Sequence, residues 1–186
     1  MRRVAALLGG VLLAAPAGCT YSYRTIEPGT HDLGRYAITT PVAWSEWLAR
    51  PTVWTVHGEG LEYVLHLNGV ADGQKMFMEL GRRETGHRFL ASWRASEVVD
   101  AFLAGMSRRR MNAGRVVKLA PASFGPWQGF GFEVEFESPM GMPMRGTGRA
   151  AIIDDELHLF FYAGAREHYY EKHLPAFEAI LASIAT

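Results

Sequence analysis

The chain has 186 residues, of which 48% are hydrophobic and 20% charged, with 19 Lys and Arg against 19 Asp and Glu. This composition is typical of one ordinary globular domain, and the balanced charge does not indicate a nucleic-acid-binding protein. The sequence contains one cysteine, so no intramolecular disulfide can form and the fold must rest on its hydrophobic core.

The N-terminus has the layout of an export signal. Arg2 and Arg3 precede an apolar stretch over residues 4–15, which is shorter than the roughly 20 residues that a membrane-spanning helix needs. Small residues then lead to Gly18 and Cys19. We therefore predict a cleavable signal peptide over residues 1–18.

The end of this signal allows two cleavage sites. The run Pro16-Ala17-Gly18-Cys19 resembles a bacterial lipobox, which implies that Cys19 becomes a lipid-modified N-terminus anchored in the membrane. Pro16 departs from the Leu, Val or Ile usual at its position. The alternative is cleavage after Ala17 by ordinary signal peptidase, which would leave a soluble exported protein. We favour the lipid-modified form, and Thr20 after the cysteine favours the outer membrane over the inner.

The mature chain is expected to have two parts, a polar tether over residues 19–33 and one domain over residues 34–186. In the first part of the domain, patterns predict strands over 36–39, 54–57, 61–68 and 75–80, with Trp44 and Trp47 in a turn-rich segment. A helix is expected over 97–111 with Ser96 as its N-cap, followed by a strand over 116–119 and a loop over 121–129.

The clearest pattern is a hairpin. Aromatic and aliphatic residues alternate with glutamates over 130–137, and glycines alternate with Arg and Thr over 144–150. Folding these strands about Gly141 would place large residues over small ones on one face and acids opposite arginines on the other, with Glu133 beside Arg149.

The C-terminal part should complete a layered domain. After a turn at residues 154–155, a strand over 157–163 carries apolar residues on both faces, so a helix is expected to cover one of them. The last helix is expected over 174–184. The predicted fold class is α+β, a mostly antiparallel β-sheet flanked by helices.

The mature domain resembles the PsbP-like superfamily, which includes DcrB-type lipoproteins. The segments that carry the resemblance are RYAITTPVAW, WTVHGEGLEYVLHL, ASEVVDAFLAGM and LHLFFYAGAREHYYEKHLPAFEAILASI. The resemblance implies an α/β/α sandwich and an envelope or accessory-binding role. It supplies no catalytic residue, because partners differ among the members and fold does not define function.

Candidate sites other than Cys19 are few. Met140, Met142 and Met144 lie in or beside the predicted hairpin turn, where thioethers could bind Cu(I) or form an apolar surface for a partner. The seven histidines show no metal-ligand spacing, and no nucleophile elbow or phosphate-binding loop occurs. We expect most of the five tryptophans to be core residues, with one or two lining a groove.

These observations favour a non-catalytic, membrane-anchored lipoprotein of the bacterial cell envelope that binds another envelope protein and uses no cofactor. The alternative is a carrier or sensor of a small apolar ligand or a soft metal. An envelope hydrolase has the least support.

Overall fold

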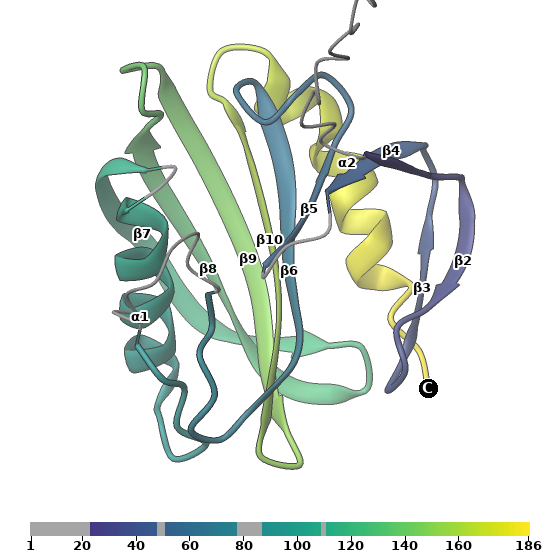
Figure 1. Cartoon of the computed structure of the whole chain (residues 1–186), viewed down its shortest axis with the longest axis vertical. Helices are drawn as coiled ribbons and strands as arrows, with labels where there is room; N and C mark the ends of the chain where they lie inside the picture. Colours follow the sequence, from purple (N-terminus) through teal and green to yellow (C-terminus); the bar gives the residue numbers. More distant parts are fainter. Residues whose placement is uncertain (1–22, 48–50, 78–86, 109–110) are drawn as a thin grey trace, which may run out of the picture.

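The computed structural model describes residues 23–47, 51–77, 87–108 and 111–186. An eight-stranded antiparallel sheet has the order β1-β4-β5-β6-β10-β9-β8-β7 (Figure 1). Its strands are β1 (Arg24–Ile26), β4 (Trp44–Trp47), β5 (Thr52–Thr55), β6 (Glu62–Ala71), β7 (Asn112–Phe124), β8 (Trp127–Glu137), β9 (Pro143–Ile153) and β10 (Glu156–Ala165). The strands β2 (Gly29–Asp32) and β3 (Ala37–Thr40) form a separate two-stranded ribbon.

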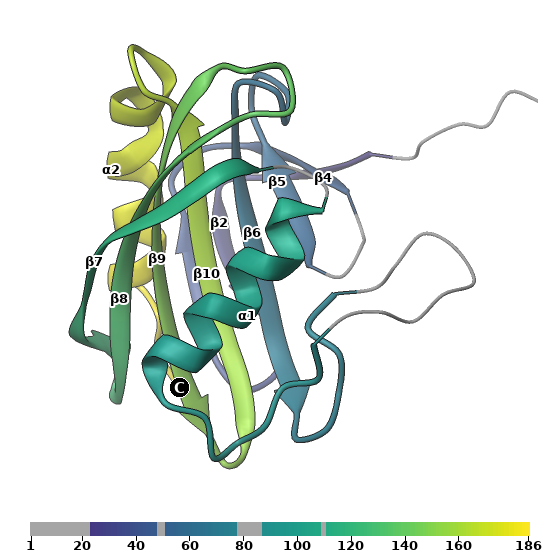
Figure 2. The same cartoon turned by 90° about the vertical axis from the view of Figure 1, so that its left-hand side faces the viewer.

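One helix packs on each face of the large sheet. The helix α1 (Ala95–Ser107) crosses one face, and α2 (Tyr169–Ala182) lies on the other beside the β2–β3 ribbon (Figures 1 and 2). Side chains of β10 alternate between two hydrophobic cores, one between the sheet and α1 (the α1 core) and one between the sheet and α2 (the α2 core). Phe161 packs in the α1 core, whereas Phe160 and Tyr162 pack in the α2 core. The predicted α+β class and the predicted helix cover over β10 are confirmed. Among the described residues, neither helix is long and apolar enough to cross a bilayer.

The β8–β9 hairpin forms, but with a register that differs by two residues from the prediction. Glu135 lies opposite Arg145, and Glu133 lies opposite Thr147 rather than Arg149. The turn is centred one residue earlier because the buried Ser138 fixes it, its N–H donating to the Met142 carbonyl at 2.8 Å. A slip of two residues keeps every side chain on its face, so the predicted faces are correct and the predicted Glu133–Arg149 pair is wrong.

The acids of β8 instead pair with cations of β7. Arg115 Nη2 lies 2.6 Å from Glu135 Oε2, and Lys118 Nζ lies 3.3 Å from Glu133 Oε1. These bonds were not expected because the sequence pattern showed only residues 116–119 as a strand, whereas β7 is much longer.

Large rings over glycines hold the centre of the α1 core. A Cβ placed on Gly148 would collide with the Phe132 ring, and one placed on Gly146 would collide with the Phe161 ring. The two rings stack with centroids 5.8 Å apart and planes inclined by 6°. The expected pairing of large side chains with small ones is therefore present, in the shifted register.

The folded part of the chain begins earlier than the expected boundary at residue 34. Residues 1–22, which include the expected signal peptide and Cys19, lie outside the described residues. Within the expected tether, β1 pairs with β4 and β2 pairs with β3. These two strands are three and four residues long and mostly polar, so they show no apolar alternation from which a strand could be predicted.

Four other elements differ from the prediction. Trp44 and Trp47 belong to strand β4 rather than to turns. Both helices begin earlier than expected. The N–H of Arg94, at the start of α1, donates to Glu97 Oε2 at 2.9 Å, so Ser96 is not the N-cap. Pro175 lies inside α2 rather than in its first turn. In the expected strand over 75–80, Lys75 makes only an isolated bridge, and residues 78–80 lie outside the described part.

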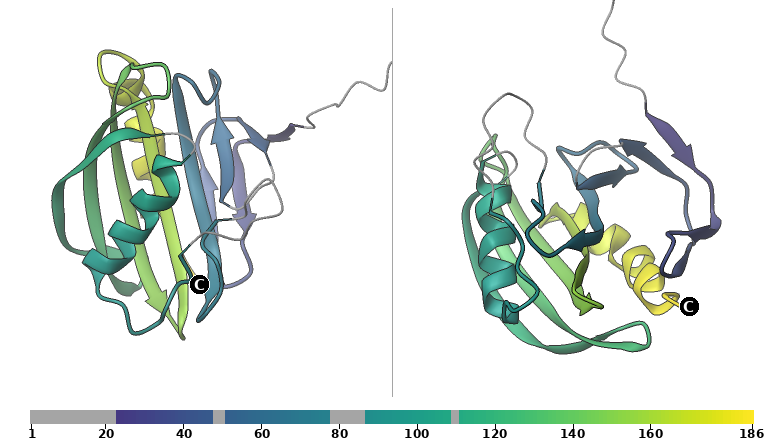
Figure 3. Two further views of the ribbon diagram at one scale, coloured as in Figure 1. Left: turned by 60° about the vertical axis from the view of Figure 1, so that its left-hand side comes forward. Right: turned by 60° about the horizontal axis from the view of Figure 1, so that its bottom comes forward.

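The expected loop over 121–129 is instead the end of the β7–β8 hairpin. Its tip curls toward the α2 side and lies near the C-terminus (Figure 3). Phe124 and Trp127 pack there in the α2 core, where the Phe124 and Tyr36 rings meet edge to face at 5.5 Å. Gly125 has a φ of 56° and leaves no room for a Cβ against Ile184.

His66 and His158 are buried on the α2 side of the sheet. They are 7% and 1% exposed, and His66 stacks on Phe160. Both ring nitrogens of His66 and Nε2 of His158 have no hydrogen-bond partner within the described chain. Burial lowers the pKa of each to about 4 because the charged ring would be desolvated.

We expect Gly148→Ala to destabilise the protein by about 1–3 kcal/mol, because the added Cβ must displace the packed Phe132 ring. Chemical denaturation measures the free energy of unfolding. Gly60→Ala is the control, since its Cβ would make only an ordinary contact with Met140 at 3.8 Å. Equal stability of wild type and Gly148→Ala would contradict this account of the core.

Acid should weaken the fold through the buried histidines. Each folded-state pKa is below the unfolded value, so the unfolded chain binds more protons as pH falls from about 6.5 toward 4 and stability decreases over that window. Between pH 7 and pH 4.5, the free energy of unfolding should fall by about 2 kcal/mol less in His66→Phe than in wild type. Denaturation at each pH measures this, and His87→Phe, at an exposed histidine, should keep the wild-type slope.

Candidate functional site

The three candidate methionines have different environments. Met140 is 81% exposed at the tip of the β8–β9 turn, whereas Met144 is 2% exposed and lies in the α1 core. Met142 is partly buried against the same core. Met140 and Met144 line a hollow of about 220 Å³ together with Glu59 and Tyr63. Met140 is the one predicted partner-surface residue that is broadly accessible.

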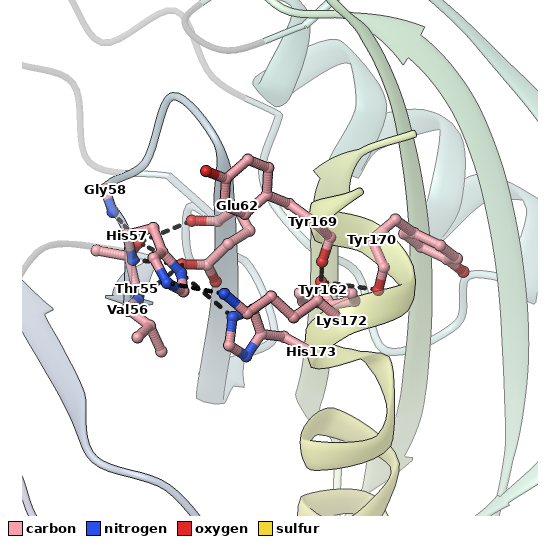
Figure 4. Close-up of polar contacts among 10 residues, drawn as sticks. All are labelled: Thr55, Val56, His57, Gly58, Glu62, Tyr162, Tyr169, Tyr170, Lys172 and His173. Atoms are coloured by element: carbon pink, nitrogen blue, oxygen red, sulfur yellow. Dashed lines mark hydrogen bonds and ion pairs between the residues drawn. The ribbon is translucent and has the colours of Figure 1, made fainter. Parts of the chain in front are cut away.

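A polar cluster joins the β5–β6 turn to the first turns of α2. We call it the histidine cluster; its members are His57, Glu62, Lys172 and His173 (Figure 4). The Glu62 side chain is fully buried at the start of β6. Its Oε1 accepts hydrogen bonds from the N–H groups of Val56 and His57 at 2.7 Å each, so this carboxylate organises the β5–β6 turn.

His57 lies at the centre of the histidine cluster. Its Nε2 is 3.2 Å from Lys172 Nζ, and its Nδ1 is 3.2 Å from His173 Nε2. An ammonium group only donates, so Nε2 of a neutral His57 must accept and its proton lies on Nδ1. That N–H then donates to His173, and the Glu62 carboxylate lies 3.7 Å from the same nitrogen.

Burial lowers the pKa of the His173 imidazole, and nearby charges act on it with opposite signs. Glu62 raises the pKa, whereas His57 and Lys172 lower it. Within the described residues, no group of three or more His, Cys, Asp or Glu side chains could hold a metal ion. The contacts of the histidine cluster are those of a link between α2 and the β5–β6 turn.

A hollow of about 410 Å³ lies between α2 and the exposed part of the β7–β9 surface, and we call it the α2 cleft. Small residues make much of its sheet side, namely Ala120, Ala122 and Gly131. Charged and polar side chains surround them: Lys118, Glu133, Arg145, Thr147, Arg149, Glu171 and Glu178.

Most charges of the α2 cleft are paired. Lys118 pairs with Glu133, and Arg145 Nη1 lies 3.4 Å from Glu171 Oε1. The Arg145 guanidinium also lies over the Tyr170 ring, 4.6 Å from its centroid. The sequence pattern placed Arg145 on the charged face of its strand, but its partner Glu171 on α2 could not be read from that pattern.

A second hollow, of about 400 Å³, lies near the start of α1. It is mostly apolar, and Trp93, Leu119, Phe130 and Ile152 line it. Trp44 and Trp54 are each 1% exposed in the α2 core. Trp44 and Trp54 are thus core residues as expected and Trp93 lines a hollow, whereas Trp47 and Trp127 are only partly buried against the cores.

Comparison with known proteins gives a likeness of fold. The chain is similar to the solution structure of cyanobacterial PsbP (CyanoP) from Synechocystis sp. PCC 6803, with 12% identity, a TM-score of 0.49, and coverage of 94% of this chain and 98% of that chain. No family model matches the chain, and no curated protein matches it.

The histidine cluster predicts opposite pKa changes from two substitutions. Glu62→Gln removes a negative charge and should lower the pKa of His173, whereas Lys172→Gln removes a positive charge and should raise it. Titration of the histidine ring resonances by NMR measures both. Glu167→Gln, at an exposed site, is the control. Shifts in the same direction for both variants would contradict the described geometry.

Proposed function

We propose that this chain is a non-catalytic, lipid-anchored protein of the bacterial envelope that binds a partner through the α2 cleft. The observation that carries the binding role is the cleft itself, which is open, charged and formed by a helix and three strands. Its described lining includes no His, Ser or Cys. The export signal and Cys19 support the anchor.

The second candidate function is carriage of a small apolar ligand, and the hollow beside Trp93 favours it. Its volume and apolar lining fit the general character of small-molecule sites. An apolar molecule that co-purifies with the protein would support this role. Nothing in the arrangement of Met140, Met142 and Met144 favours the soft-metal alternative.

The anchor and the cleft can be tested separately in living cells. Wild type should incorporate a fatty-acid analogue and Cys19→Ser should not, since the thiol is the attachment point. Absence of label in wild type would reduce the proposal to a soluble exported protein.

For the cleft, a photo-crosslinking residue at Glu178 should capture an envelope protein. The same residue at Glu167, an exposed position outside the cleft lining, is the matched control. Equal capture from both positions would contradict binding through the α2 cleft.

A further inference from the structure

One cation of the α2 cleft has no ion-pair partner. Arg149 is half-buried on β9, and no described acid lies within ion-pair distance of its guanidinium, although Lys118 and Arg145 in the same cleft are both paired. Leaving a half-buried charge without a partner has an energetic cost unless water or a ligand satisfies it. This guanidinium is therefore the group in the cleft that is most available to an incoming anion.

The position of Arg149 depends on the absence of a side chain opposite it. Arg149 faces Gly131 across the β8–β9 ladder, and a Cβ on Gly131 would collide with Arg149 Nη1. The guanidinium thus lies over the Gly131 backbone of β8. This contact restricts where the guanidinium can lie, so its N–H donors are partly ordered before any ligand arrives.

The surrounding charges limit the kind of anion. The lining contains three cations, Lys118, Arg145 and Arg149, and three acids, Glu133, Glu171 and Glu178, so its formal charge is zero. A multiply charged phosphate would meet the three carboxylates as well as the arginine. A single carboxylate would match the one unpaired guanidinium and could accept two parallel hydrogen bonds from it.

The size of the cleft indicates that the carboxylate belongs to a larger molecule. A volume of about 410 Å³ falls in the range of small-molecule sites and exceeds what a bare carboxylate would fill. Carbon atoms of Pro121 and Leu174 also line the cleft and offer apolar contact.

We propose that the α2 cleft holds its partner by one carboxylate of that partner, bound by Arg149, for which a small carboxylic acid is a probe. This inference rests on the proposed binding role of the cleft, and it does not depend on the lipid anchor. The hydroxyl of Thr147, which lines the cleft from the same face of β9, is a further hydrogen-bonding group for the ligand.

The test titrates benzoate into the purified full-length chain in detergent and follows the arginine side-chain resonances by NMR. Wild type should bind with a dissociation constant of about 1 mM or tighter, and Arg149→Gln should weaken binding about tenfold. Gly131→Ala should also weaken it, because the new Cβ displaces the guanidinium without removing its charge. Arg166→Gln, at an exposed arginine outside the cleft lining, should bind as wild type does.

Three results would overturn the proposal: no benzoate binding by wild type, unchanged binding by Arg149→Gln or Gly131→Ala, or an equal loss in Arg166→Gln. A second titration uses inorganic phosphate, which should bind more weakly than benzoate. Tighter binding of phosphate would overturn the assignment of a carboxylate. These measurements need neither lipid attachment nor a protein partner, so their failure is distinguishable from failure of the in vivo experiments.

Discussion

The packing of Phe132 and Phe161 against Gly148 and Gly146 determines how β8, β9 and β10 come together. Where these rings lie, the α1 side of β9 carries glycines, and the residues that alternate with those glycines point to the other face. The alternation that builds the α1 core therefore also directs Arg145 and Arg149 toward α2. The hydrophobic core and the charged cleft lie on opposite faces of the same strands. A change in strand register would therefore alter both of them.

The strand faces could be predicted from the sequence, but the residue pairs could not. Alternation of large and small residues fixes which side of β8 faces the core, so the class of fold and the hairpin were correct. The pairing of Glu133 with Arg149 was wrong because a two-residue shift preserves every face. What selects the register is the turn around Ser138 together with the cations of β7, and the sequence pattern showed only part of that strand.

The site residues illustrate a different limit. His57 and His173 are 116 positions apart, and they meet only because α2 packs beside the β5–β6 turn. Periodicity describes neighbours along one element and carries no signal for such a meeting. The same holds for Arg145 and Glu171, which come from β9 and α2. Only the methionines and Cys19 could be chosen as candidates, because their chemistry is local in the sequence.

The residues that follow α2 have a consequence for the order in which the fold is completed. Ala37 and Ala185 exchange two backbone hydrogen bonds, at 2.8 and 3.1 Å, and Ile184 packs against the tip of the β7–β8 hairpin. Both contacts join segments that are far apart in the sequence, so they close long loops of chain. Neither the ribbon containing β3 nor the hairpin tip can reach its final packing before residues 184 and 185 are in place.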